Sequence, residues 1–268
     1  MYFRAYIIGV RKFLFLLFHY LKSPFVLFFA FLGGRQHCII CNKGTYLLPL
    51  CRDCRNERYY KNVNNMLFYQ NRCKICGRPL VSTREICPLC RETNVLKNVD
   101  KAIPLFEYRL WNKELLFLWK IQGIRTLSVF FANLCRQVLE NQNVKFIVPV
   151  PPRPGKIQKN GWDQIDELCN FLELRYGFCR LNLLERTSNL QQKKLGRTER
   201  FEKSELSYCI KNQMEVEKQL YKTGGCFPEE VCIIDDVCTT GATLESCASV
   251  LRAHTPIKKI TSMTLFIV

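Results

Sequence analysis

Segment 231–243 combines the residue types that bind a sugar phosphate. A short apolar run is followed by two adjacent carboxylates and a small, hydroxyl-rich turn: Asp235, Asp236, Thr239, Thr240, Gly241, Ala242 and Thr243. A glycine-containing turn at a helix start directs backbone N–H groups and the positive end of the helix dipole toward a phosphate. Adjacent carboxylates at a strand end accept hydrogen bonds from ribose hydroxyls or lie near a metal. Each piece alone is more often an ordinary capped turn, but their order favours a sugar-phosphate site.

Eight cysteines form four Cys-x2-Cys pairs with the spacing of metal ligands: Cys38, Cys41, Cys51, Cys54, Cys73, Cys76, Cys87 and Cys90. Each pair directs two thiolates at one ion, and a second pair completes a tetrahedral shell that leaves no position open for substrate. The pattern therefore predicts two structural Zn²⁺ sites in a double zinc ribbon. A redox motif needs only one pair, and the sequence indicates no redox partner for an iron–sulfur cluster. Sequential and crossed pairings both fit the spacing.

Composition is that of a folded, intracellular protein. The 268 residues are 48% hydrophobic and 24% charged, which excludes the disordered and collagenous classes. The other eight cysteines are scattered, as buried thiols in a reducing cytosol are, so we expect a cytoplasmic protein. The net charge of +17 favours anionic partners such as nucleic acid, nucleotide phosphates or an acidic membrane face.

Basic and aromatic residues alternate through the cysteine-rich segment. Between residues 35 and 101 there are 13 basic and 5 acidic side chains, with Tyr59, Tyr60, Phe68 and Tyr69 among them. Such interleaving suits single-stranded DNA, whose bases stack on rings while cations follow the backbone. A solvated, rigid spacer whose charge offsets the tetrathiolate ions is an equally good interpretation.

The N-terminal hydrophobic segment has nearly the length of a membrane span. Residues 13–32 are apolar except near the middle, where Lys22 and Pro24 interrupt the run. A central lysine and proline favour an interfacial or core-packed helical hairpin over a true span. The predicted organisation is a hydrophobic segment at 1–34 that contacts the inner membrane or uptake machinery, a double zinc ribbon at 35–100 and an α/β domain at 101–268.

Apolar runs and amphipathic stretches alternate after Lys101, as in an α/β protein. Helices are expected at 115–140 with a break near Gly123, at 162–176 and at 243–252. Strands are expected at 145–150, 231–234 and 259–268. Strands separated by helices predict a mostly parallel sheet, whose ligands bind at the carboxyl ends of the strands. The acidic pair and the threonine-rich turn lie at such an end.

Segment 231–243 resembles the phosphoribosyl pyrophosphate (PRPP) motif of type I phosphoribosyltransferases, and the chain from Cys38 onward resembles the ComF family. That family joins a double zinc ribbon to a phosphoribosyltransferase-like domain and is associated with DNA uptake in natural transformation. Four further segments agree: Ile103-Pro-Leu-Phe-Glu-Tyr108 followed by Lys120-Ile-Gln-Gly123, Val148-Pro-Val-Pro-Pro152, Gly161-Trp-Asp-Gln164, and Gln192-x2-Leu195-x4-Arg200.

The resemblance implies residue roles. Asp235 and Asp236 would hold the ribose hydroxyls of Mg²⁺-bound PRPP, and the 239–243 turn would hold its 5′-phosphate. Arg153, Lys156 and Arg200 would bind the pyrophosphate, which a nucleophile displaces from the anomeric carbon.

The chain departs from the family mainly in the pyrophosphate half. Asn160 replaces a usual arginine, and Trp162 and Asp163 replace phenylalanine and asparagine. Lys203 replaces an asparagine, and Gly155-Lys156 occupies the place of paired basic residues. Two functions therefore remain open: a phosphoribosyltransferase with an unassigned acceptor, and a non-catalytic module. The latter would sense PRPP or a nucleotide while its ribbons and basic surface dock DNA or uptake machinery.

Overall fold

The computed structural model describes residues 36–45, 48–66, 71–80, 84–93, 95–187 and 208–268. The chain forms two compact units, 1–59 and 60–268. The second unit contains the later four of the eight paired cysteines together with the α/β sheet. The predicted functional boundaries after residues 34 and 100 stay predictions.

The first unit contains a small hairpin and a helical turn. Strands β1 (Gln36–His37) and β2 (Gly44–Thr45) pair antiparallel, with Gln36 opposite Thr45. Asn42 has a φ of 61°, and its N–H bonds to the Cys38 carbonyl at 2.8 Å, which closes the turn between the strands. Helix α2 (Arg52–Arg55) leads into the π-helical turn η1 (Asn56–Tyr60). Each Cys-x2-Cys pair of this unit thus lies on a tight local turn.

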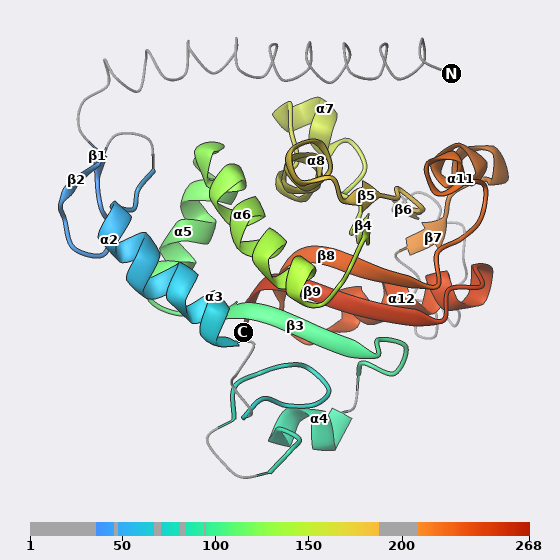
Figure 1. The fold of residues 1–268 in the computed structure, drawn as a ribbon, viewed down its shortest axis with the longest axis horizontal. Helices are drawn as coiled ribbons and strands as arrows, with labels where there is room; N and C mark the ends of the chain where they lie inside the picture. Colours follow the sequence, from blue (N-terminus) through green and yellow to red (C-terminus); the bar gives the residue numbers. More distant parts are fainter. Residues whose placement is uncertain (1–35, 46–47, 67–70, 81–83, 94, 188–207) are drawn as a thin grey trace, which may run out of the picture. The chain divides into compact units, whose positions relative to one another are not determined.

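The second unit is built on a five-stranded parallel sheet with the order β3-β9-β8-β4-β5, which confirms the predicted α/β class (Figure 1). Its strands are β3 (Lys101–Glu107), β4 (Phe146–Pro149), β5 (Cys179–Arg180), β8 (Glu230–Cys238) and β9 (Lys259–Ile267). Every β9 residue from Ile260 onward is buried, as expected of an inner strand covered on both faces.

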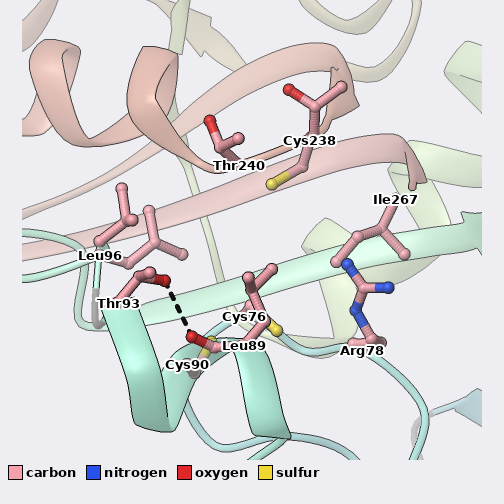
Figure 2. Close-up of a pocket in the computed structure, with 11 residues that line it drawn as sticks. Cys76, Arg78, Leu89, Cys90, Thr93, Leu96, Cys238, Thr240 and Ile267 are labelled. Atoms are coloured by element: carbon pink, nitrogen blue, oxygen red, sulfur yellow. Dashed lines mark hydrogen bonds between the residues drawn. The ribbon is translucent and has the colours of Figure 1, made fainter.

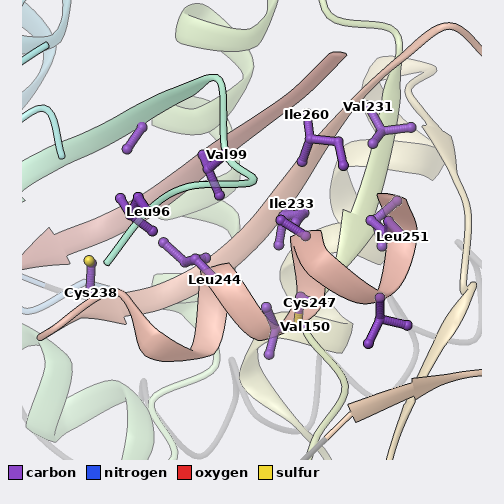
Figure 3. Packing of buried hydrophobic residues seen from close by; sticks show 14 of the residues in the cluster. Leu96, Val99, Val150, Val231, Ile233, Cys238, Leu244, Cys247, Leu251 and Ile260 are labelled. Atoms are coloured by element: carbon purple, nitrogen blue, oxygen red, sulfur yellow. The ribbon is translucent and has the colours of Figure 1, made fainter. Parts of the chain in front are cut away.

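Helices cover both faces of this sheet (Figure 1). Helices α5 (Trp111–Lys120), α6 (Thr126–Asn141) and α8 (Gln164–Tyr176) lie over one face, and α12 (Ala242–His254) lies over the other. The predicted break near Gly123 is confirmed, because Gly123 has a φ of +66° between α5 and α6. Val231 and Ile233 of β8 pack with Leu244 and Leu251 of α12 (Figure 3).

Shorter elements surround this core. They are α3 (Lys61–Met66), α4 (Pro88–Thr93), α7 (Lys156–Asn160), the antiparallel pair β6 (Leu184–Arg186) and β7 (Tyr208–Ile210), α11 (Gln213–Leu220) and the 3₁₀ turn η2 (Tyr221–Thr223). None of the helices in the described ranges has the length and hydropathy to cross a membrane. The predicted hydrophobic segment 13–32 lies outside those ranges.

Strand β8 is longer than the apolar run 231–234 predicts. Its ladder with β9 continues through the pairs Asp235–Thr264, Val237–Phe266 and Cys238–Ile267. The acidic pair therefore lies inside the strand rather than after it. Backbone pairing with the buried strand β9 keeps the backbone of the two aspartates extended, although polar residues at this position would favour a turn.

Candidate functional site

The two carboxylates of β8 point to opposite faces of the sheet, because successive side chains of a strand alternate. Asp236 lies on the side of α5 and α8, where its Oδ2 contacts Lys120 and Gln164. Asp235 lies on the side of α12, where burial, with the neighbouring Asp235 carboxylate as a second cause, raises the pKa of Cys247. The Asp236 N–H also donates to Asp235 Oδ1 at 2.8 Å. The pair thus presents two carboxylates held at fixed and different orientations.

Asp236 is held in an ionic network. Lys120 Nζ lies 2.6 Å from Asp236 Oδ2, and Gln164 Nε2 donates to the same oxygen at 3.3 Å. The Asp236 side chain is 12% exposed, so solvent screens this charge pair weakly. The last residue of α5, the first residue of α8 and the end of β8 therefore converge on one carboxylate.

Lys156, the first residue of α7, joins the same network. Its Nζ lies 2.6 Å from Asp163 Oδ2 and 2.5 Å from Gln164 Oε1. Asp163 is also the N-cap of α8, since its Oδ1 accepts from the N–H groups of Ile165 and Asp166 at 3.0 Å. An N-cap accepts aspartate and asparagine almost equally. The departure at Asp163 therefore preserves the helix start and adds an anionic partner for Lys156.

A buried polar cluster fixes the helices that carry this network. Glu167 of α8 is 5% exposed and accepts from Arg125 Nε at 2.6 Å and from Ser128 Oγ at 2.7 Å. The Ser128 hydroxyl accepts in turn from Trp119 Nε1 at 2.8 Å. Arg125 also lies over the ring of Trp162 at 5.6 Å. These contacts link α5, α6 and α8, so the positions of Lys120 and Gln164 depend on one another.

The 239–243 turn, predicted to bind phosphate, leads directly into helix α12. Gly241 adopts a φ of +90° and is the N-cap of the 13-residue helix α12. Thr239 and Thr240 are exposed, and the Ala242 N–H lies 3.3 Å from Thr240 Oγ1. Thr243 is partly buried and hydrogen-bonds to Tyr208. The helix start thus offers two threonine hydroxyls at the surface, with a third held by β7.

The environment of Asp235 favours its protonated form. Burial, with the nearby charge of Asp236, raises its pKa to about 7, and the hydrogen bond from the Asp236 N–H opposes that shift. Asp235 therefore changes charge near neutral pH. A carboxylate of this kind ionises readily when a cation or a set of hydroxyl donors approaches.

A second polar region lies beside the network. A pocket of about 500 Å³ is lined by the proline-rich segment after β4 and by the start of the β6–β7 pair. Its walls include the predicted pyrophosphate ligand Arg153, with Arg186 and Lys211. Neither the acidic pair nor the 239–243 turn is among its described lining residues. Arg153 and Lys156 are thus placed in different surroundings, and Arg200 lies outside the described residues.

The eight paired cysteines form two groups of four, in sequential order. The ligand atoms of Cys38, Cys41, Cys51 and Cys54 lie within 4.8 Å of one another, as do those of Cys73, Cys76, Cys87 and Cys90. The sulfurs of Cys41 and Cys51 are 3.6 Å apart, and those of Cys76 and Cys87 are 3.7 Å apart. A tetrahedral site with Zn–S bonds of ~2.3 Å has sulfur–sulfur edges of roughly 3.8 Å. Both groups therefore fit a tetrathiolate zinc ion.

Backbone donors favour the thiolate form of one cysteine in each group. The Cys54 N–H lies 3.4 Å from Cys51 Sγ, and the Cys87 N–H lies 3.4 Å from Cys73 Sγ. Burial opposes ionisation, but backbone donors outweigh it and lower the pKa of Cys38 to about 6 and that of Cys73 to about 7. The ligand that a metal needs is the thiolate, so these contacts favour binding.

Two of the aromatic residues proposed to stack on DNA bases are engaged elsewhere. Tyr59 is 2% exposed. Tyr60 packs edge-on against Phe130 at 6.0 Å, and its hydroxyl accepts from Asn133. Phe68 and Tyr69 lie outside the described residues. Among the described aromatic residues of this segment, Tyr59 and Tyr60 therefore offer packing rather than open stacking faces.

Sequence reasoning missed several residues that build the site. Lys120 and Gln164 were marked by the family resemblance, but their contact with Asp236 was not predicted. Glu167 was not singled out. The signal available for Glu167 was an acidic residue on an apolar helix face, which indicates a buried partner.

Comparison with known proteins confirms the resemblance to ComF proteins that the sequence motifs indicate. No family model matches the chain. Competence protein ComFC of Streptococcus pneumoniae (strain ATCC BAA-255 / R6) is 26% identical over 205 residues, which cover 76% of this chain and 81% of that protein. Competence protein ComFC of Bacillus subtilis (strain 168) is 25% identical over 261 residues, which cover 87% of this chain and 97% of that protein. The chain is therefore similar to these two competence proteins over most of its length.

Proposed function

We propose that this ComFC homologue acts in competence and binds PRPP with Mg²⁺ at the carboxyl end of β8. The proposal depends on one stretch of chain in which the acidic pair, the turn and the start of a helix follow one another. Two carboxylates of opposite orientation lead directly into a turn whose Gly241, with a φ of +90°, starts a 13-residue helix. The hydroxyl groups of a ribose need hydrogen-bond acceptors, and its phosphate binds well at a helix N-terminus. Here the two features follow each other directly along the chain.

Each group has a role in this proposal. Asp236, on the face of α5 and α8, accepts ribose hydroxyls, Asp235 is the second acceptor that the resemblance implies, and the 239–243 turn donates to the 5′-phosphate. Lys120 forms an ion pair with Asp236 in the structure. When the ribose binds Asp236, the Lys120 ammonium group moves toward the pyrophosphate. The magnesium ion supplies charge neutralisation on the pyrophosphate oxygens.

In a transferase reaction, the bond between the anomeric carbon and the pyrophosphate oxygen breaks as a nucleophile of the acceptor bonds to that carbon. Pyrophosphate leaves with the bonding electrons, and the developing positive charge on the sugar lies beside the carboxylates. Arg153 and Lys156, with Arg200 as a further candidate, stabilise the leaving group.

A second candidate is a module that binds PRPP or a nucleotide without turnover. The observation that favours it is the engagement of Lys156, whose Nζ lies 2.6 Å from Asp163 and 2.5 Å from Gln164. A lysine so paired contributes less to leaving-group stabilisation than a free one. Lys156 reaches the ribose half only through Gln164, which donates to Asp236.

The test is calorimetric titration of PRPP with Mg²⁺ into the full chain and into an Asp235→Asn, Asp236→Asn double variant. Saturable binding that the double variant loses supports the site, and the absence of binding to the wild type overturns it. Glu229→Gln is a matched control, because Glu229 is exposed and pairs with Lys258 away from the turn. Pyrophosphate release with candidate acceptors then separates the transferase from the sensing module.

A contact with single-stranded DNA belongs to the same proposal. It is supported by the net charge of +17 and by exposed basic residues of the cysteine-rich segment, including Arg52 and Arg91. Fluorescence anisotropy of a labelled oligonucleotide, measured over a series of salt concentrations, tests this contact. When a protein binds DNA through the phosphates, the logarithm of the binding constant falls linearly with the logarithm of the salt concentration. Binding that is absent at low salt would contradict it.

A further inference from the structure

The second cysteine group is part of the hydrophobic core of the sheet domain. Cys73, Cys76, Cys87 and Cys90 are all buried, and they belong to the same cluster as Leu244 and Cys247 of α12. The first group differs, since Cys41 is exposed and Cys51 and Cys54 are partly exposed. The second group is therefore built into the domain that contains the candidate site.

Leu96 connects this cysteine group to the phosphate turn. It follows Cys90 by six positions in the chain, is 6% exposed, and lies directly against Gly241. A Cβ atom at Gly241 would lie 3.0 Å from Leu96 Cδ2 and 3.2 Å from Leu96 Cγ. Leu96 thus fills the space behind the turn and leaves no room for a side chain at Gly241.

Glu245 forms a second connection, at the first turn of α12. Its carboxylate accepts from the Lys97 N–H at 2.8 Å, from the Asn98 N–H at 2.9 Å and from Asn98 Nδ2 at 2.6 Å. The Glu245 N–H donates to the Gly241 carbonyl at 2.9 Å. A free carboxylate beside a phosphate site would repel the ligand. These three donors hold the Glu245 charge on the segment that follows the cysteines.

Arg252 fixes the same segment to the far end of α12. Its Nε donates to the Asn98 carbonyl at 3.3 Å, and its Nη2 lies 2.6 Å from Asp100 Oδ2. The Asp100 carboxylate also accepts from the Ile260 N–H at 2.6 Å. Residues 96–100 are therefore held along α12 from its first turn to its last and are joined to β9.

A small cavity separates the cysteine group from the back of the turn. Cys76 and Cys90 line it from one side, and Cys238 and Thr240 line it from the other (Figure 2). Thr239 lines it as well. Leu96 also borders this cavity. A displacement of the cysteine turns would therefore reach the phosphate turn through Leu96, which borders the cavity and packs against Gly241.

We infer that the second cysteine group positions the phosphate turn through Leu96 and Glu245, so that metal occupancy at Cys73, Cys76, Cys87 and Cys90 controls affinity for the sugar phosphate. This inference rests on the proposed function and extends it to the regulation of the same site. Loss of the metal frees the cysteine turns, removes the support behind Gly241 and releases the Glu245 carboxylate next to the phosphate. Leu96 and Glu245 act as positioning residues.

The test compares Leu96→Ala with Val99→Ala in the full chain. Both residues are buried in the same segment, but only Leu96 borders Gly241 among the contacts described for that glycine. For Leu96→Ala we expect the Kd for PRPP with Mg²⁺ to rise at least tenfold while the zinc content stays at two ions per chain. For Val99→Ala we expect a Kd within twofold of the wild type. Equal effects of the two variants would overturn the inference.

A pair of cysteine variants tests the role of the metal. Cys90→Ser removes a ligand of the second group, and Cys51→Ser removes one of the first. The contacts that support the inference join residues 96–100, which follow the second group, to residues 241–252. We therefore expect Cys90→Ser to weaken PRPP binding at least tenfold. We expect Cys51→Ser to leave PRPP binding unchanged. Equal binding by both variants would contradict metal control.

Hydrogen–deuterium exchange of the peptide that covers 237–245 separates this inference from the proposed function, because it needs no ligand. We expect faster exchange there in Leu96→Ala and Cys90→Ser than in Val99→Ala and Cys51→Ser. If exchange increases but the wild type does not bind PRPP, the proposed function fails and the structural coupling stands. If the wild type binds PRPP but exchange is unchanged, the coupling fails and the proposed function stands.

Discussion

Lys120 Nζ at the end of α5 lies 2.6 Å from Asp236 Oδ2 in β8, with the two side chains 29% and 12% exposed. This ion pair occupies the carboxylate that we propose for ribose recognition. It keeps a buried negative charge paired when no sugar is bound. A lysine that exchanges partners on ligand binding is a compact, mobile charge suited to this task.

Removal of the Lys120 charge leaves Asp236 with Gln164 as its described partner. We expect Lys120→Met to lower the free energy of unfolding by ~2 kcal/mol, the typical effect of losing a hydrogen bond to a charged group. Urea denaturation measures the change. Lys145→Met is the matched control, because Lys145 is exposed, and its expected effect is within ~0.5 kcal/mol. Equal stability of both variants would show that the pair contributes nothing to folding.

Asp235 makes stability depend on pH. Its pKa is raised to about 7 in the folded chain, whereas an unfolded aspartate has a pKa of ~3.9. Between these values the folded state retains a proton that the unfolded state has lost, so the free energy of unfolding decreases as pH rises through this window. The stabilisation is present below the unfolded pKa and is lost above the folded one.

Urea denaturation at several pH values between 4 and 8 measures this dependence in the wild type and in Asp235→Asn. We expect the variant to have a smaller decrease over the interval, because asparagine does not titrate. Identical slopes would mean that Asp235 is ionised throughout the interval.

Asp163 combines two functions that one substitution separates. Asp163→Asn retains the N-cap of α8 but removes the negative charge opposite Lys156, so we expect nearly unchanged stability and tighter binding of pyrophosphate. Asp163→Ala removes the cap as well, and we expect it to lower stability by ~1 kcal/mol. Thermal unfolding and calorimetric titration of pyrophosphate with Mg²⁺ measure both quantities. Weaker pyrophosphate binding by Asp163→Asn would show that Lys156 does not serve that ligand.

The two cysteine groups predict a metal content of two zinc ions per chain. We expect Cys41→Ser and Cys76→Ser to retain one ion each and the double variant to retain none, as measured by atomic emission of the purified protein. Cys226→Ser is the control, because Cys226 is an exposed cysteine outside both groups, and it should retain two. A content of one ion in the wild type would contradict the predicted double site.

Local patterns determined several features of this protein. The four Cys-x2-Cys pairs predicted two tetrathiolate groups, because the ligands of each group come from short turns within one stretch of chain. The apolar runs at 145–150, 231–234 and 259–268 predicted parallel strands, because a strand buried on both faces has no polar positions to alternate with. The turn at Gly241 followed from the glycine and the threonines at a helix start.

Only the tertiary structure decided how these pieces meet. The extension of β8 through Asp235 and Asp236 depends on the ladder with β9, which overrides the local preference of two aspartates for a turn. The sequential grouping of the cysteines depends on which turns face each other. The Lys97–Glu245 contact joins residues 148 positions apart. Such contacts arise from packing between elements, and neither residue carries a local signal of its partner.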